Sequence, residues 1–225
     1  STQVDTSTTT AFSLCLDASD NIYVVYQRSD DIYFRKLTYW VSGSTWTVGT
    51  ERSVEVDGKS SYNPTIIRED NGKIWVGYGH QGVAGGALVR TRYSDDEFAT
   101  EGTIENVSSA EPAANPEDYF PALTLRSGSP FIVYQDNIYG NVKWSSWNGS
   151  SWSSPATISD VTPDGSGDFS VTLTGSDVHL VYNHNNAGIK YTYYNGSSWS
   201  SPEALSTSIS DQNPSLTTNN VDLWC

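Results

Sequence analysis

Short segments in which apolar and polar residues alternate recur along the chain at intervals of about 50 residues. The clearest segments have a large aliphatic residue in first place and Tyr in third place. They are 24–27, 76–79, 132–135 and 180–183. A period of two residues is typical of a β-strand with one face buried. A similar segment precedes each of them, so the pattern predicts repeated pairs of antiparallel strands.

An eight-residue run occurs twice without change. Asn148 to Pro155 reads Asn-Gly-Ser-Ser-Trp-Ser-Ser-Pro, and the same run returns 47 residues later, from Asn195 to Pro202. Each copy follows a strand-like segment, 142–147 or 189–194. Because Asn-Gly favours the tight turn of a β-hairpin, the run predicts a turn between the third and fourth strands of a repeat. A run shared by successive repeats is expected to be scaffold.

Four strands in a unit of this length indicate the blade of a β-propeller. The sequence therefore predicts an all-β domain over 1–225, with four full blades of four antiparallel strands and a partial fifth. The blade ranges are about 11–57, 62–108, 119–160 and 168–207, with 213–225 and 1–10 sharing the fifth. Two alternatives stay open: a ring closed by an incomplete blade, or a piece of a larger propeller.

Composition narrows the set of partners. With 225 residues, the chain has the length of one domain, and no apolar run is long enough for a membrane span. The net charge of −14, with only 12 Lys and Arg, argues against nucleic acid and against anionic membrane surfaces. The chain contains no Met and no signal-peptide pattern, as expected of a mature or excised chain.

Two cysteines and three Asn-x-Ser sequons indicate in which cellular compartment the protein is found. In a five-bladed ring, Cys15 and Cys225 would stand on neighbouring strands, where a disulfide would close the ring. The alternative is two unrelated thiols. The sequons are at Asn106, Asn148 and Asn195, and two of them coincide with the repeated turn. Both features predict an extracellular or cell-surface protein.

The unit that ends in Gly149 and Trp152, and again in Gly196 and Trp199, resembles the repeat of sialidase-like propellers with a degenerate Asp-box. It is also similar to the blades of fucose-type propeller lectins. The resemblance to sialidases implies three arginines that grip a carboxylate, with a Tyr nucleophile, its Glu partner and an Asp acid. Arg68 and Arg126 match two such positions, but the equivalent positions of the other blades hold no Arg. The sialidase chemistry is therefore not carried over to this chain.

The blades differ most in the loops that follow their second strands and in the connections between blades, which share one rim of a propeller. Amides, carboxylates, His and Tyr at this rim suit sugar hydroxyls and sugar rings. The candidate ligand-binding residues are Gln27, Arg28, His80, Gln81, Asp118, Tyr119, Gln135, Asp136, Tyr139, Asn183 and His184. The competing interpretation is that such residues simply end strands and form turns.

Catalysis at the rim is a weaker interpretation. Asp118 and Asp136 are the best glycosidase pair, and His80 with Tyr119 is a candidate for proton abstraction. No metal site or cofactor is predicted, although the acidic rim leaves Ca²⁺ open. The leading function is a lectin-like, non-catalytic module that binds carbohydrate or a surface protein. The alternative is a carbohydrate-active enzyme, either a sialidase-like glycoside hydrolase or a polysaccharide lyase, or a fragment of one.

Overall fold

A computed structural model describes residues 4, 9–40, 43, 45–82, 86–110, 119–136, 140–158, 161, 169–184, 188–208, 211, 213–218 and 223–225. The chain divides into two compact units, Ser1–Pro121 and Ala122–Cys225. Each unit is described by itself, and the single domain over 1–225 stays a prediction. All regular structure in the described residues consists of β-strands, and among them no helix has the length and apolar character to cross a membrane.

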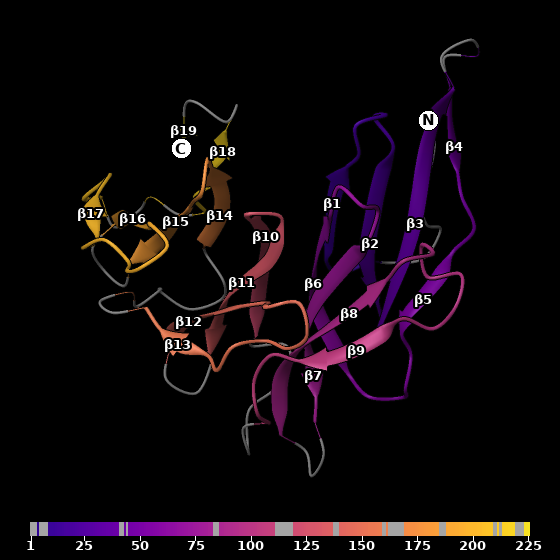
Figure 1. Ribbon diagram of the computed structural model, residues 1–225, viewed down its shortest axis with the longest axis horizontal. Coiled ribbons are helices and arrows are strands. Elements are labelled where there is room, and N and C mark those ends of the chain that lie inside the picture. Colours follow the sequence, from indigo (N-terminus) through magenta and orange to yellow (C-terminus); the bar gives the residue numbers. More distant parts are fainter. Residues whose placement is uncertain are drawn as a thin grey trace. The chain divides into compact units, whose positions relative to one another are not determined.

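The first sheet is antiparallel and lies in the order β1-β2-β3-β4 (Figure 1). Its strands are β1 (Phe12–Leu16), β2 (Ile22–Arg28), β3 (Asp31–Trp40) and β4 (Thr45–Val48). A fifth strand, β5 (Arg52–Glu55), pairs with the first half of β3, while β4 pairs with its second half. The fourth place in this sheet is thus shared by two short strands. The break between them begins near Gly49, whose backbone N–H donates to the carbonyl of Lys36 at 2.8 Å.

Three further sheets have four antiparallel strands each, in chain order. The second contains β6 (Ser61–Arg68), β7 (Ile74–Gln81), β8 (Ala87–Ser94) and β9 (Thr103–Asn106). The third contains β10 (Phe120–Arg126), β11 (Ser129–Asp136), β12 (Asn141–Ser146) and β13 (Ala156–Thr157). The fourth contains β14 (Phe169–Thr174), β15 (Asp177–His184), β16 (Gly188–Tyr194) and β17 (Glu203–Ala204). A two-stranded sheet follows, of β18 (Thr217–Thr218) and β19 (Leu223–Trp224).

The second strand of each sheet supplies the core, as its apolar pattern predicts. The tyrosines in the third place of the repeated pattern, Tyr26, Tyr78, Tyr134 and Tyr182, are all 0–1% exposed. In the first unit, Tyr23, Val25 and Phe34 of the first sheet pack against Ile66 and Val76 of the second. The apolar alternation therefore buries one sheet against the next.

The repeated run forms the predicted hairpin turn twice. The backbone N–H of Asn148 donates to Ser151 at 3.1 Å, and the N–H of Asn195 donates to Ser198 at 3.2 Å. Gly149 and Gly196 begin the two loops with φ of +99° and +101°. Because this region of φ favours Gly, the Asn-Gly pair fixes the turn. The turn joins the third and fourth strands of the third and fourth sheets, which confirms the prediction.

Candidate functional site

The polar residues that end β2 bond to neighbouring residues of the first unit. Gln27 is 3% exposed, and its side-chain amide donates to the carbonyl of Ser29 at 2.9 Å. Arg28 donates two hydrogen bonds to the carboxylate of Glu51, at 3.0 and 2.9 Å, and its guanidinium lies 3.9 Å from the ring centre of Tyr33. Gln27 Oε1 also accepts a hydrogen bond from the backbone N–H of Asn63 in β6 at 3.4 Å. Both side chains are thus engaged within the first unit, and their binding of a ligand stays a prediction.

His80, near the end of β7, is completely buried. Its Nδ1 lies 2.9 Å from Ser61 Oγ, and its Nε2 lies 3.5 Å from the carboxylate of Asp57. Burial, followed by the positive charge of Arg90, lowers the pKa of His80 to about 4. The ring is therefore neutral at pH 7. The next residue, Gln81, is half-buried, and its backbone N–H donates to the carbonyl of Ser60 at 2.8 Å.

The candidates from the third and fourth sheets also lie mostly inside. Gln135, Asp136 and Asn183 are 1–5% exposed, and Asp136 forms an ion pair with Lys143. His184 is half-buried, with its ring centre 6.1 Å from that of Tyr182. Burial and internal pairing agree with the alternative interpretation, in which these residues end strands.

Three rim candidates remain. Tyr119, in the first unit, is 1% exposed, and its carbonyl accepts a hydrogen bond from Asn63 Nδ2 at 3.0 Å. Asp118 and Tyr139 lie outside the described residues. The proposed acid pair of Asp118 with Asp136 therefore stays a prediction, as does the pairing of His80 with Tyr119.

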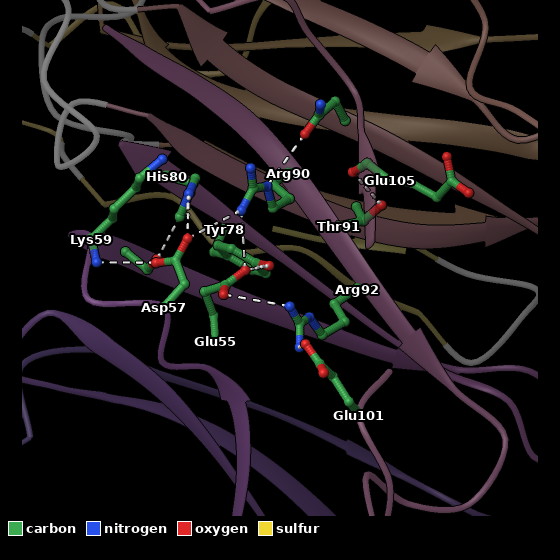
Figure 2. A network of polar contacts seen from close by, with 12 residues as sticks. Glu55, Asp57, Lys59, Tyr78, His80, Arg90, Thr91, Arg92, Glu101 and Glu105 are labelled. Carbon is green, nitrogen blue, oxygen red and sulfur yellow. Dashed lines mark hydrogen bonds and ion pairs between the residues drawn. The ribbon is translucent and has the colours of Figure 1, made fainter. Parts of the chain in front are cut away.

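The structure brings together a set of charged residues that the sequence did not single out. Glu55, at the end of β5, is 1% exposed and accepts a hydrogen bond from the hydroxyl of Tyr78 at 2.6 Å. Its carboxylate also lies 3.3 Å from Arg90 Nη1 and 3.4 Å from Arg92 Nη2. Burial, followed by the charge of Glu55, raises the pKa of Tyr78 well above its usual value. Figure 2 shows these four side chains converging from β5, β7 and β8.

Arg92 lies between two carboxylates, as Figure 2 shows. Its Nη1 is 3.3 Å from Glu101, whose side chain is 81% exposed, on the opposite side from Glu55. Among the described residues, the buried Nε of Arg92 has no hydrogen-bond partner. Asp57 lies 3.9 Å from Arg90 Nη1. Three carboxylates, those of Glu55, Asp57 and Glu101, thus share two guanidinium groups.

An open groove of about 550 Å³ runs beside these residues, between β5 and the loop that joins β8 to β9. We call it the β5 groove. Its lining combines charged and apolar side chains. They are Glu51, Arg52, Ser53, Val54, Glu55, Val56, Asp57, Arg92, Phe98, Ala99, Thr100, Glu101 and Ile104. Val56 and Ile104 are 47% and 40% exposed, so apolar surface is available beside the carboxylates.

The sequence does contain a signal for this site. Arg90 and Arg92 stand two residues apart on one strand, and therefore on one face, in a chain with only 12 basic residues. Their carboxylate partner comes from β5, a four-residue strand reached through a break in the fourth place of the sheet. The apolar pattern does not locate so short an edge strand.

The two cysteines and the three sequon asparagines differ in how far their side chains are exposed to solvent. Cys15 is half-buried and Cys225 is exposed. They belong to different units, so the disulfide stays a prediction. The three sequon residues, Asn106, Asn148 and Asn195, are exposed, and their glycosylation stays a prediction. Within the described ranges, no three His, Cys, Asp or Glu side chains converge as metal ligands.

Comparison with known proteins gives matches at the level of structure. No protein-family model matches the chain, and neither does a curated protein. The intramolecular trans-sialidase of Ruminococcus gnavus has a TM-score of 0.63 at 9% identity, over 88% of this chain and 71% of that one. The leech intramolecular trans-sialidase has a TM-score of 0.66 at 10% identity, over 90% of this chain and 51% of its own.

A lectin gives a further match. The Aleuria aurantia lectin, solved with Fucα1-6GlcNAc, has a TM-score of 0.52 at 17% identity, over 86% of this chain and 60% of the lectin. This chain spans about half the length of the leech enzyme. Identities this low establish the fold alone. With its antiparallel sheets of four strands, the chain has a sialidase-like propeller fold, which it shares with a fucose-binding lectin.

Proposed function

We propose that the chain is a glycan-recognition module, lectin-like and non-catalytic, and that the β5 groove holds the sugar. The observation that carries this proposal is the lining of the groove. Exposed Val56 and Ile104 offer apolar surface to the C–H face of a sugar ring, and Glu101 offers carboxylate oxygens to its hydroxyl groups. The similar solved structures include two trans-sialidases and a lectin bound to a fucosylated sugar, which supports a role with carbohydrate.

The charge of the groove favours sugars without a carboxylate. Four carboxylates line it, those of Glu51, Glu55, Asp57 and Glu101, against the two guanidinium groups of Arg52 and Arg92. Arg92 is already held by two of these carboxylates. An acidic sugar would add a further negative charge to this set, whereas a neutral or amino sugar would donate hydrogen bonds to it.

A carbohydrate-active enzyme is the second candidate, because Tyr78 and Glu55 form a Tyr–carboxylate pair beside two arginines. The same residue types serve the sialidases that the repeat resembles. However, Tyr78 is 0% exposed and Glu55 is 1% exposed, and burial raises the pKa of Tyr78. A nucleophile needs access to the substrate and a readily lost proton, so these observations support the non-catalytic candidate.

The test is a glycan array with neutral, amino and sialylated glycans, followed by titration calorimetry with the best ligand. Glu101→Gln removes an exposed carboxylate from the groove, and Glu203→Gln removes an exposed one from β17. We expect Glu101→Gln to weaken binding by roughly tenfold, and Glu203→Gln to leave it unchanged. Absence of binding to any glycan would contradict the proposal. Release of reducing sugar or of an unsaturated product would favour the enzyme.

We also propose how the sheets form blades and where the protein is located. We take the first sheet and each of the three four-stranded sheets as one blade, with the β18–β19 sheet as the start of a fifth, in an extracellular or cell-surface protein. We keep the candidate ligand-binding residues at the ends of the second strands as additional contacts for a glycan or a surface protein. Ca²⁺ bound at acidic loops is a further proposed contact. If the chain binds a surface protein that carries no glycan, the ligand is that protein and not a sugar.

A further inference from the structure

The repeated turn holds each of its two exposed asparagines in the same geometry. Asn148 Oδ1 accepts hydrogen bonds from the backbone N–H groups of Ser150 and Ser151, both at 2.9 Å, and from the hydroxyl of Ser150 at 3.0 Å. Asn195 Oδ1 accepts the three equivalent bonds at 2.9, 2.9 and 3.0 Å. Donors aimed at a carbonyl oxygen stabilise the negative charge that develops there when a nucleophile attacks the carbonyl carbon. Both side-chain amides are therefore polarised for attack at Cγ.

The backbone nitrogen of the following Gly is a nucleophile next to each of these amides. Among the described residues, the N–H groups of Gly149 and Gly196 donate no hydrogen bond. Both glycines are exposed, and neither carries a side chain that would obstruct the approach of its nitrogen. Together with C, Cα and Cβ of the Asn, this nitrogen and Cγ can close a five-membered ring. The turn thus leaves the nucleophile unbonded beside a polarised amide.

We propose that Asn148 and Asn195 are sites of spontaneous deamidation in the folded chain. The nitrogen of the following Gly loses its proton to water and forms a bond to Cγ, and the Cγ–Nδ2 bond breaks, so that the amide nitrogen takes up a proton and leaves as ammonia. Water then opens the five-membered imide at either carbonyl carbon and leaves Asp or isoAsp, without any oxidant or reductant. The reaction adds a negative charge and removes the Asn of the sequon. Deamidation and glycosylation therefore exclude each other at these two positions.

A third Asn-Gly pair, Asn71 with Gly72, has a different geometry. The N–H of Gly72 donates to the carbonyl of Glu69 at 2.9 Å, so this nitrogen is already bonded. Asn71 Oδ1 accepts a hydrogen bond from the N–H of Lys73 at 2.8 Å, and Asn71 Nδ2 donates to the carboxylate of Glu69 at 2.8 Å. The negative charge of Glu69 also opposes the loss of a proton from the nearby backbone nitrogen. We therefore expect Asn71 to react more slowly than the two asparagines of the repeated turn.

One charged side chain distinguishes the two copies of the turn. A Cβ placed on Gly196 would meet Nη2 of Arg126, so this guanidinium lies against the glycine. Nothing lies within 4 Å of a Cβ placed on Gly149. A nearby positive charge favours the deprotonated nitrogen, which is the attacking species. Asn195 should therefore deamidate faster than Asn148.

The experiment is peptide mass spectrometry of the whole chain, made in a host that does not glycosylate it and incubated at mildly alkaline pH. In the folded chain, Asn148 and Asn195 should gain one mass unit at least about tenfold faster than Asn71. In guanidinium chloride, all three should react at similar rates, because each precedes Gly. This comparison separates the effect of the structure from that of the sequence. Arg126→Gln should slow the reaction at Asn195 by roughly two- to fivefold and leave that at Asn148 unchanged.

Fragmentation that distinguishes Asp from isoAsp tests the route, since the imide gives both products. Equal rates at Asn71 and Asn148 in the folded chain would overturn the proposal. So would a folded chain in which Asn148 and Asn195 stay intact for as long as the unfolded chain takes to react, or Asp as the only product. Circular dichroism establishes that Arg126→Gln folds, and an unchanged rate at Asn195 in that variant would refute the effect assigned to Arg126.

Discussion

The hydroxyl of Tyr78 donates a hydrogen bond of 2.6 Å to Glu55 at a point that water does not reach. The equivalent tyrosine of the first sheet, Tyr26, makes a contact of the same length with Glu51. The two carboxylates differ in exposure, because the side chain of Glu51 is 27% exposed and that of Glu55 is 1% exposed. The same Tyr–Glu hydrogen bond therefore occurs once with a buried carboxylate, that of Glu55, and once with a partly exposed one, that of Glu51.

Tyr78→Phe and Tyr26→Phe therefore form a matched pair of variants. In Tyr78→Phe the buried carboxylate loses a hydrogen bond that water cannot replace, so we expect a loss of about 1–3 kcal/mol in the free energy of unfolding. In Tyr26→Phe the half-exposed Glu51 regains water and keeps Arg28 and Arg35, so the loss should be under about 1 kcal/mol. Urea denaturation measures both. Equal losses would mean that the burial of Glu55 carries no energetic penalty.

His80 should make stability depend on pH. Its folded-state pKa of about 4 lies below the ordinary value near 6.5, so the unfolded chain binds the proton more readily between these two values. The contribution of His80 to stability is complete above pH 6.5 and is lost as the pH falls from 6.5 to 4. Glu51, with a pKa lowered to about 2 chiefly by the hydrogen bonds from Arg28, loses its contribution only between about pH 4.5 and 2.

The variant His80→Gln isolates this effect. Between pH 6.5 and 5, the free energy of unfolding of the variant should fall less steeply than that of the wild-type chain. His179, whose pKa burial also lowers, remains in both proteins, so the difference between the two slopes belongs to His80. Chemical denaturation at several pH values gives the slopes. Identical slopes would show that His80 does not become protonated on unfolding in this range.

The sequence predicted the sheets because their signals are local. In each second strand an aliphatic residue is followed two places later by Tyr, and all four of these tyrosines are buried in the structure. The Asn-Gly turn was equally predictable, since Gly149 needs a φ that other residues avoid. Both signals lie within a few residues of the structure that they determine.

The candidate site was harder to predict because its members are close in space and distant in sequence. Glu55 meets Tyr78, Arg90 and Arg92 only after β5 has paired with β3 past an irregularity in register. A shift of one residue in that pairing would turn Glu55 to the opposite face. Conversely, Gln27 and His80 looked like ligand contacts because they end strands, yet they bond to Ser29 and Ser61 within the protein.

The two cysteines should differ in reactivity in the reduced chain. Burial raises the pKa of Cys15 to about 12, so almost no thiolate is present at pH 8, whereas Cys225 is exposed. We expect iodoacetamide to alkylate Cys225 at least tenfold faster than Cys15, as measured by peptide mass spectrometry. Equal rates would contradict the burial of Cys15. A mass two units lower in the unreduced chain, with neither thiol labelled, would instead establish the disulfide between Cys15 and Cys225.

The first copy of the repeated turn is surrounded by open space, so a substitution there tests backbone strain alone. Gly149 has φ of +99°, and nothing lies within 4 Å of a Cβ placed there, so Gly149→Ala changes the backbone strain without a clash. We expect it to lower the free energy of unfolding by roughly 1–2 kcal/mol. At Gly196, with φ of +101°, the same Cβ also meets Nη2 of Arg126, whose Nε donates to the carbonyl of Ser176 at 3.0 Å.

Gly196→Ala should therefore lower stability by the same amount or slightly more, because Arg126 is a flexible side chain that can move aside at the expense of an exposed hydrogen bond. Ser154→Ala, at an exposed position of the first copy of the run, is the control and should be neutral. Thermal or urea unfolding compares the three. If Gly149→Ala were neutral while Gly196→Ala was not, the clash with Arg126 would matter and the φ of the turn would not.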